Sequence, residues 1–218
     1  MKILTIIPAR KGSKRLPGKN YKLLGEYPLI VHSILYAQEN GLKDIVITTD
    51  DPQIKAIASQ YHIPVVDRPE TISGDHATTI SALQHVLEVL PKTYDTVILL
   101  QPTNPLRPSS LLHEALELYK SGHYDSLMTV SAVTHKLGRI SENKFLPYNY
   151  ELGQRSQEIP PLYFENGLLY IAQTSLIEQG ILLGEHHYPL VVAHPFAQID
   201  IDTEEDFIYA TYLLNQLK

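Results

Sequence analysis

Five positively charged side chains lie within ten positions near the N-terminus, from Arg10 to Lys19. Gly12 and Gly18 are interspersed among them, and the apolar run from Ile3 to Ile7 directly precedes them. Lys and Arg bind phosphate oxygens through charge-assisted hydrogen bonds, and glycine lets the backbone approach an anion closely. Ligands of open parallel sheets bind beyond the carboxyl ends of the strands. The segment therefore predicts a phosphate-binding loop.

The spacing of this loop excludes two common phosphate motifs. Five residues separate Gly12 from Gly18 where a P-loop has four, and Asn20 replaces the Ser or Thr that a P-loop requires. The dinucleotide-binding pattern lacks its third glycine. Two other interpretations are a solvated basic loop and a nuclear-localisation-like run over residues 10–15. The preceding strand and the Pro17-Gly18 pair favour a shaped loop instead.

A second candidate site lies near the C-terminus, where Asp200 and Asp202 are two positions apart in an extended segment. Their carboxylates share one side of the chain, while Ile199 and Ile201 point to the other. Two carboxylates can hold Mg²⁺ and leave its remaining positions to phosphate and water. Alternatively, Asp202 with Glu205 reads as a helix N-cap and its capping-box partner.

Gln101 follows the apolar run from Val97 to Leu100, which predicts a central strand buried on both faces. The Gln101 amide can donate and accept hydrogen bonds at once, which suits a polyhydroxylated ligand. In the alternative, Pro102 and Pro105 shape a turn whose backbone is bonded by Gln101 and Arg107.

Between about residues 133 and 161 the hydrophobic periodicity is lost, which indicates an inserted segment rather than a second core. Arg155 lies in this segment and suits a ligand that carries a carboxylate, because a guanidinium pairs with a carboxylate in bidentate fashion. The alternative is a surface arginine near a subunit contact.

The elements that must position these residues alternate between short apolar runs and amphipathic helical patterns. We expect one α/β domain over residues 1–218, with a mainly parallel sheet covered by helices on both faces. Pro52 suits a helix start, and Gly41 and Gly122 suit helix exits. The expected strands are 3–7, 44–48, 96–100, 126–130 and 167–172, and the expected helices are 29–40, 52–61, 79–90, 111–120 and 203–217.

The composition narrows the class of protein. The net charge of −6 argues against a nucleic-acid or anionic-membrane partner, so an anionic ligand requires a local basic cluster. The absence of cysteine excludes disulfides, zinc-thiolate sites and thiol nucleophiles. Apolar runs are too short to span a bilayer, and the N-terminus lacks a cleavage signal. We expect a soluble, cytoplasmic protein. The ten histidines are scattered and indicate no metal or catalytic site.

Four segments, in order and covering nearly the whole chain, resemble the acylneuraminate cytidylyltransferases, the CMP-sialic acid synthetases and their relatives. The resemblance implies a Rossmann-like fold of the nucleotide-diphospho-sugar transferase type, with a small dimerisation subdomain inserted at about 133–161. It also implies a homodimer in which part of the sugar site comes from the neighbouring chain. The matching segments are Pro8–Asn20, Leu100–Arg107, Asn166-Gly167 with Tyr170, and Asp200-Ile201-Asp202.

The resemblance also implies the reaction. The anomeric hydroxyl of an acidic nine-carbon 2-keto sugar attacks the α-phosphorus of CTP, and pyrophosphate leaves. The nucleotide would be bound by Ala9, Arg10, Gly12, Lys19, Asn20, Arg68 and Thr79. The sugar would be bound by Gln101, Arg155, Asn166 and Tyr170. Asp200 and Asp202 would carry Mg²⁺ and act in catalysis together with Arg10 and Lys19.

Some assignments stay open within the resemblance. Lys136 and Arg139 are both candidates for a lysine that the family often aims at the sugar, and Asn104 stands where serine is usual. No side chain stands out as a general base. Legionaminic, pseudaminic and 3-deoxy-manno-octulosonic acids present the same carboxylate and anomeric hydroxyl as a sialic acid. A sugar-1-phosphate nucleotidyltransferase would share the fold, and so would a catalytically silent nucleotide- or sugar-binding relative.

Overall fold

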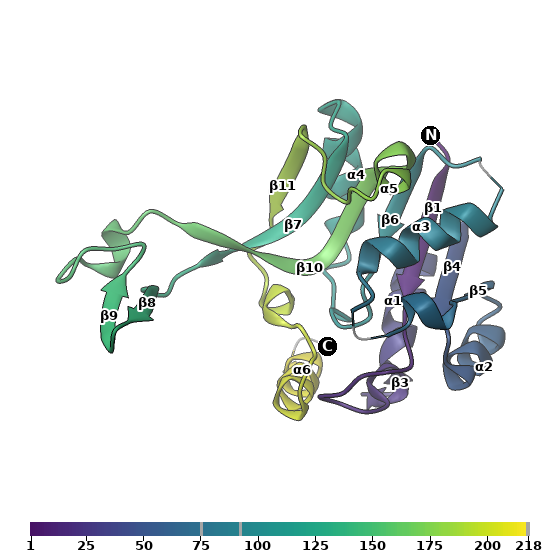
Figure 1. Cartoon of the computed structure of the whole chain (residues 1–218), viewed down its shortest axis with the longest axis horizontal. Helices are drawn as coiled ribbons and strands as arrows, with labels where there is room; N and C mark the ends of the chain where they lie inside the picture. The colour runs from purple at the N-terminus through teal and green to yellow at the C-terminus, as the bar shows by residue number, and fades with distance from the viewer. Residues whose placement is uncertain (75, 92, 217–218) are drawn as a thin grey trace.

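The computed structural model describes residues 1–74, 76–91 and 93–216 of the chain. Across these residues a seven-stranded sheet has the order β11-β7-β10-β6-β1-β4-β5 (Figure 1). Strand β10 runs antiparallel to both of its neighbours, and the other pairings are parallel. The expected mainly parallel α/β sheet is confirmed. Its strands are β1 (Ile3–Pro8), β4 (Asp44–Thr49), β5 (Val65–Asp67), β6 (Thr96–Leu99), β7 (Ser126–Val133), β10 (Leu162–Gln173) and β11 (His187–Val191).

All five predicted strands are present, and β6 occupies the middle of the sheet with every residue buried. Strands β5 and β11 lie at the two edges and were not predicted. The first has three residues, and the second is largely exposed, so neither produces a strong apolar run. Two small hairpins complete the strands: β2 (Leu23–Leu24) with β3 (Tyr27–Pro28), and β8 (Gly138–Ser141) with β9 (Lys144–Pro147).

The five predicted helices are also present, with ends that differ by a few residues at most. Asp51 caps α2 through the Gln53 amide, and Pro52 occupies its first turn. Gly41 follows the end of α1 with φ of 73°, and Gly122 caps α4. Leu217, the predicted end of the last helix, lies outside the described residues. The helices are α1 (Leu29–Glu39), α2 (Pro52–Gln60), α3 (Thr79–Val89), α4 (Leu111–Ser121), α5 (Thr174–Glu178) and α6 (Glu204–Gln216), with short 3-10 turns at η1 (Lys19–Tyr21), η2 (Glu70–Ile72), η3 (Ser156–Glu158) and η4 (Pro195–Gln198).

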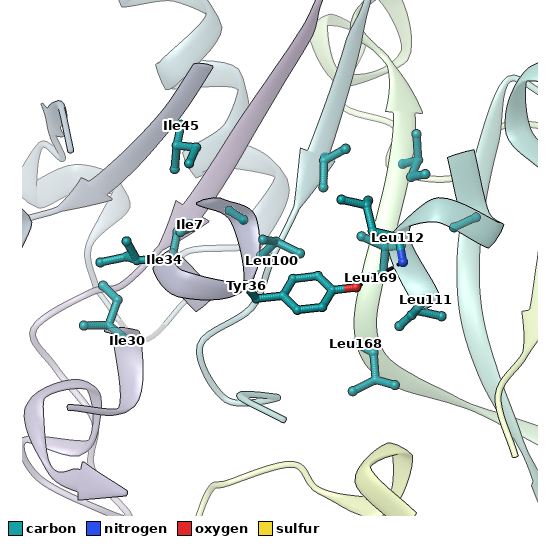
Figure 2. Packing of buried hydrophobic residues seen from close by; sticks show 14 of the residues in the cluster. Ile7, Ile30, Ile34, Tyr36, Ile45, Leu100, Leu111, Leu112, Leu168 and Leu169 are labelled. Atoms are coloured by element: carbon teal, nitrogen blue, oxygen red, sulfur yellow. Dashed lines mark hydrogen bonds between the residues drawn. The ribbon is translucent and has the colours of Figure 1, made fainter. Parts of the chain in front are cut away.

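The core lies on both faces of the sheet, as the continuous apolar runs of the central strands require. Helices α1, α2 and α4 pack on one face and α3 and α5 on the other. Figure 2 shows the first cluster, in which Tyr36 reaches from α1 to α4 and its hydroxyl accepts a hydrogen bond from the Leu112 amide at 3.0 Å. A third cluster joins α6 to Leu16, Leu24, Ile199 and Ile201. The C-terminal helix therefore packs against both the basic loop and the extended segment that contains Asp200 and Asp202.

Residues 134–161, which we term the lobe, extend away from the sheet on the long ribbon formed by β7 and β10 (Figure 1). The lobe contains the β8–β9 hairpin and η3, and its residues are largely exposed. No helix within the described residues is long and apolar enough to cross a membrane.

Candidate active site

A cleft of about 520 Å³ opens at the carboxyl ends of the central strands. Three parts of the chain form its walls: the basic loop (residues 9–20), the N-terminus of α3, and the turn that follows β6. The cleft brings together segments from opposite ends of the chain. Of the residues expected in a site, Arg10, Gly12, Lys19, Asn20, Arg68, Thr79, Gln101 and Asp202 line it.

The basic loop is anchored to the end of β4. The Ala9 amide donates to Thr48 O at 3.0 Å, and Thr49 Oγ1 donates to Ala9 O at 2.5 Å. The Lys11 amide donates to the carboxylate of Asp50 at 2.8 Å. Ala9, expected to bind the nucleotide, is 1% exposed and is not among the described residues that line the cleft, and its amide and carbonyl tie the loop to the sheet.

Two glycines allow the loop to fold as it does. Gly18 has φ of 71°, and a Cβ there would lie 2.6 Å from the ring of Tyr21. Gly12 leaves room for the Arg10 guanidinium, which a Cβ would approach to 3.2 Å. The Asn20 amide donates to Arg10 O at 3.3 Å and so closes the loop across its base. The glycine spacing thus serves the shape of the loop as well as the approach of a ligand.

Lys19 connects the basic loop to the acidic segment. It is 7% exposed, and its Nζ donates to Ile201 O at 2.6 Å and to Asp202 Oδ1 at 2.9 Å. The guanidinium of Arg15 pairs with Asp202 Oδ2 at 2.5 Å and is 68% exposed. Both oxygens of Asp202 are therefore compensated by cations of the loop. The sequence indicated Arg15 as one of the loop's charges but did not single it out as a site residue.

Asp200 and Asp202 point away from the core, because Ile199 and Ile201 are buried against α6 as expected. Burial and the neighbouring Asp202 raise the pKa of Asp200, while the Thr103 hydroxyl and Lys19 oppose that change. The two carboxylates are thus close enough to repel each other, and a cation between them would relieve the repulsion.

The donor set at this position fits a nucleotide-bound Mg²⁺ better than a cation held by protein alone. The described part of the chain contains no group of three or more His, Asp or Glu side chains that could hold a metal. An ion on Asp200 and Asp202 would therefore take its other ligands from phosphate and water, as Mg²⁺ commonly does.

The alternative role for Asp202 as a helix cap is wrong. Thr203 is the residue before α6, and its Oγ1 accepts the Asp206 amide at 3.3 Å. The Asp206 carboxylate accepts the amides of Thr203 at 2.8 Å and Asp202 at 3.0 Å. The capping box is therefore Thr203 with Asp206, one position later than Asp202 with Glu205, and the Asp202 carboxylate is left to the cleft.

Arg68 and Thr79 also line the cleft. Arg68 is 8% exposed, and its Nη2 donates to Thr48 O at 3.0 Å. Burial lowers the pKa of Arg68 to about 10, with Asp50 opposing the change. Thr79 begins α3, where unpaired amides and the helix dipole favour an anion. Both residues were located in the sequence through family resemblance alone.

The turn after β6 has features of both interpretations of its sequence, a cleft-lining Gln101 and a turn held by hydrogen bonds to its backbone. The Gln101 side chain lines the cleft, while its carbonyl accepts the guanidinium of Arg107 at 2.8 Å. Arg107 is buried and also donates to Leu168 O at 2.6 Å and to Ser33 Oγ at 3.0 Å. Arg107 is a structural residue of the turn, while Gln101 is one of the residues that line the cleft.

Two residues expected at the sugar have their polar groups engaged elsewhere. Asn166 is 3% exposed. Its side-chain Nδ2 donates to Ser131 Oγ at 3.0 Å, and its Oδ1 accepts from Thr129 Oγ1 at 2.6 Å. Tyr170 is 5% exposed and donates its hydroxyl to Glu165 Oε2 at 3.1 Å. Burial and Glu165 raise the pKa of that phenol. In this structure both side chains support the wall of the site rather than line the cleft.

The remaining sugar candidates lie in the lobe. Arg155 is exposed and is not among the described residues that line the cleft. Lys136 Nζ donates to Gln154 O at 2.5 Å, and Arg139 lies in β8. On the lobe of a single chain (Figure 1), none of the three is brought to the cleft.

Sequence reasoning missed Thr103 and Glu165. Thr103 lines the cleft and contacts Asp200, but it lay inside a motif where Gln101 drew attention. Glu165 lies within β10 directly before Asn166-Gly167 and accepts the Tyr170 hydroxyl, and a charged residue inside a largely apolar strand was the available signal.

Comparison with known proteins places the chain among related sequences. Residues 4–217 match the sequence profile of a family described as Cytidylyltransferase. N-acylneuraminate cytidylyltransferase of Streptococcus agalactiae serotype III (strain NEM316) is 36% identical over 219 residues, covering 96% of this chain and 52% of that protein. CMP-N,N'-diacetyllegionaminic acid synthase of Legionella pneumophila is 37% identical over 229 residues, covering 98% and 97%. The chain thus spans about half the length of the first relative.

Among solved structures, the CTP complex of CMP:2-keto-3-deoxy-manno-octonic acid synthetase is similar with a TM-score of 0.71. The similarity covers 99% of each chain at 18% sequence identity. At that identity it establishes the architecture, which agrees with the Rossmann-like nucleotidyltransferase fold expected from the sequence.

Proposed function

The chain belongs to the cytidylyltransferase family, and on that premise we propose that it transfers CMP from CTP to the anomeric hydroxyl of a nonulosonic, sialic-type acid. Pyrophosphate is the second product. One observation carries the proposal: the cations of the basic loop and Asp202 meet in a single cleft, joined by the contact between Lys19 and Asp202, and Asp200 adjoins that cleft through Thr103. In this proposal the wall that binds phosphate adjoins the residues that bind the metal.

In the proposed reaction, the oxygen of the anomeric hydroxyl bonds to the α-phosphorus and the bond to pyrophosphate breaks. Such a transfer depends on positioning and on neutralising charge at the phosphoryl group and leaving group. Arg10 and Lys19 would neutralise the triphosphate, and Asn20 and Arg68 would hold the nucleotide. The proton of the hydroxyl would pass to an aspartate of the acidic segment or to solvent.

Asp200 and Asp202 would hold Mg²⁺ in this proposal. When bound there, the ion supplies positive charge at the transferring phosphoryl group. Asp202 would exchange Arg15 for the ion, because the Arg15 guanidinium is exposed and the Lys19 ammonium is anchored by Ile201 O. Arg15 would then be available to the phosphates.

The acceptor is proposed to be a sialic-type acid, and the same reaction on legionaminic, pseudaminic or 3-deoxy-manno-octulosonic acid is the alternative. The relatives named for neuraminate and legionaminate chemistry are almost equally similar to this chain, so identity does not choose between them. A catalytically silent relative is disfavoured because Lys19, Asp200 and Asp202 are all present and gathered in one region.

We further propose that the lobe forms a homodimer. Its surface exposes large apolar side chains, which is unusual for a monomer. In a dimer, Arg155 of one chain would reach the sugar site of the other and pair with the acceptor carboxylate. The most exposed apolar residues are Ile140 at 79%, Tyr148 at 76% and Leu152 at 80%.

The decisive experiment is a pyrophosphate-release panel that crosses four nucleoside triphosphates with several nonulosonic and octulosonic acids, with and without Mg²⁺. We expect release with CTP, a free sugar acid and Mg²⁺. Release with a sugar 1-phosphate instead of the free acid would assign the chain to the other transferase class. The absence of release with CTP and every acid would overturn the proposal.

A further inference from the structure

Strand β10 has an irregular stretch where it passes the carboxyl end of β6. Tyr170 pairs with Leu99, the last residue of β6, so the residues that precede Tyr170 extend over the turn containing Gln101. On the other side, the register with β7 shifts between Glu165 and Tyr170. The irregular stretch therefore lies at the edge of the sheet where ligands of this architecture bind.

This irregularity brings together two side chains that a regular strand would separate. Residues five positions apart in a strand lie roughly 17 Å from each other and on opposite faces. The hydroxyl of Tyr170 nevertheless donates to Glu165 Oε2 at 3.1 Å. The bulge at Asn166-Gly167 makes this contact possible, because Gly167 adopts φ of 71°.

The bulge is held rigidly against the acidic segment. A Cβ on Gly167 would lie 2.5 Å from Asn104 Oδ1. The Asn104 amide donates at 2.8 Å to both Asn166 O and Ile199 O. One side chain thus connects the bulge to the residue before Asp200, so the position of Glu165 relative to Asp200 is set by direct bonds.

Glu165 is exposed, whereas the Tyr170 that binds it is buried. Asp200 lies close enough to Tyr170 to act on its phenol together with Glu165, and Asp200 in turn contacts Thr103 on the wall of the cleft. Glu165, Tyr170 and Asp200 therefore form a wall that adjoins the cleft on the β10 side. Thr103, which Asp200 contacts, lies two residues after Gln101 in the turn where the acceptor is expected, and both line the cleft.

The chemistry of this wall limits what Glu165 can bind. Within the described residues Glu165 is not part of a group of three ligands that could hold a metal. A carboxylate accepts hydrogen bonds and repels other carboxylates, so its partner on a sugar acid must be a hydroxyl or an amide N–H.

We propose that Glu165 is a specificity-determining residue that accepts a hydrogen bond from a hydroxyl or acylamino N–H of the acceptor, and that Tyr170 is the residue that positions it. This inference rests on the proposed transferase function. Under this inference Glu165 contacts the acceptor, whereas Tyr170, which was expected at the sugar, only holds Glu165 in place.

The test compares Glu165→Ala, Glu165→Gln and Tyr170→Phe with wild type in the pyrophosphate-release assay, measuring KM for the acceptor and for CTP separately. Loss of a charge-assisted hydrogen bond should raise the acceptor KM of Glu165→Ala by roughly 10- to 100-fold. Glu165→Gln should show a smaller increase, because its amide oxygen still accepts a hydrogen bond. Tyr170→Phe should shift the acceptor KM in the same direction, and the KM for CTP should stay unchanged in all three.

Glu117→Gln is the matched control, because Glu117 is an exposed glutamate on α4 that lines no described wall of the cleft. Acceptors lacking a single hydroxyl, and acceptors carrying hydroxyl in place of the acylamino group, identify the group that Glu165 reads. The Glu165→Ala penalty should vanish for the analogue that lacks it. Melting temperatures verify folding, and Glu165→Gln retains the shape of the side chain if Glu165→Ala does not fold.

Two outcomes overturn the inference while leaving the proposed function intact. If both Glu165 variants keep the wild-type KM for the acceptor, Glu165 does not contact the acceptor. If the KM for the acceptor and the KM for CTP increase equally, the role of Glu165 is purely structural. Absence of turnover by the wild type with CTP and every acid would overturn the proposed function itself, and this inference with it.

Discussion

Lys19 Nζ lies 2.9 Å from Asp202 Oδ1, so a buried cation of the basic loop is paired with one of the two carboxylates proposed to hold Mg²⁺. The two residues are 183 positions apart in the chain. The contact joins the basic loop, proposed to bind phosphate, to the acidic segment, proposed to bind the metal, and Ile201 O accepts a second hydrogen bond from the lysine. Changes to either segment should therefore affect the other.

Lys19→Met is expected to lower kcat/KM by about 10²- to 10³-fold, because it removes a fixed positive charge from the site of phosphoryl transfer. Lys22→Met is the matched control. Lys22 pairs with Glu204 and packs over Phe207, and it is not among the described residues lining the cleft. Steady-state pyrophosphate release checks both variants. Equal rates for the two would contradict the role of Lys19.

Asp200→Asn is expected to abolish turnover and to raise the melting temperature near neutral pH. Burial and Asp202 raise the pKa of Asp200, so its ionised form is less favourable in the folded than in the unfolded chain. The destabilisation is present above that raised pKa. It disappears as the pH falls through the folded-state pKa toward the ordinary aspartate value. Thermal melts of both proteins across this range test the sign, and a variant that melts below wild type at neutral pH would refute it.

Asp206→Ala is expected to lower the free energy of unfolding by about 1 kcal/mol through loss of the α6 cap. Partial burial acts to raise the pKa of Asp206. The hydrogen bonds from Asp202 and Thr203 and the positive charge of Arg15 outweigh that effect and lower this pKa. Glu205→Ala should have little effect on stability, since the capping box is formed by Thr203 and Asp206. Urea denaturation distinguishes the two. A larger loss of stability in Glu205→Ala than in Asp206→Ala would instead support Asp202 and Glu205 as the capping box.

Ile140→Asp is expected to convert a dimer into a monomer, because it places a charge on the apolar surface of the lobe, where Ile140 is 79% exposed. The fold of the single chain should be retained, since the side chain is outside the described core clusters. Sedimentation velocity gives the oligomeric state. A wild-type chain that sediments as a monomer would contradict the proposed dimer, and retention of full acceptor affinity by a monomeric variant would argue against a shared sugar site.

The elements of the fold were predictable where the pattern was strong. The fully buried β6 and the amphipathic helices impose local periodicities, and caps such as Asp51 mark their ends. The cap of α6 was misplaced because the same four-residue motif occurs in two adjacent frames. Asp202 with Glu205 and Thr203 with Asp206 both fit it, and only the backbone geometry at the helix start selects the second.

The sequence by itself determined the composition of the site: a basic, glycine-bearing loop after a buried strand, and two carboxylates on one side of an extended segment. These follow from burial patterns and alternation that act over a few neighbouring residues. Tertiary structure decided which of the candidate side chains line the cleft. It engaged Asn166 within the wall, turned Tyr170 toward Glu165 and left Arg155 on the lobe. Those outcomes depend on strand direction, a bulge and hydrogen bonds between distant segments, which no local pattern encodes.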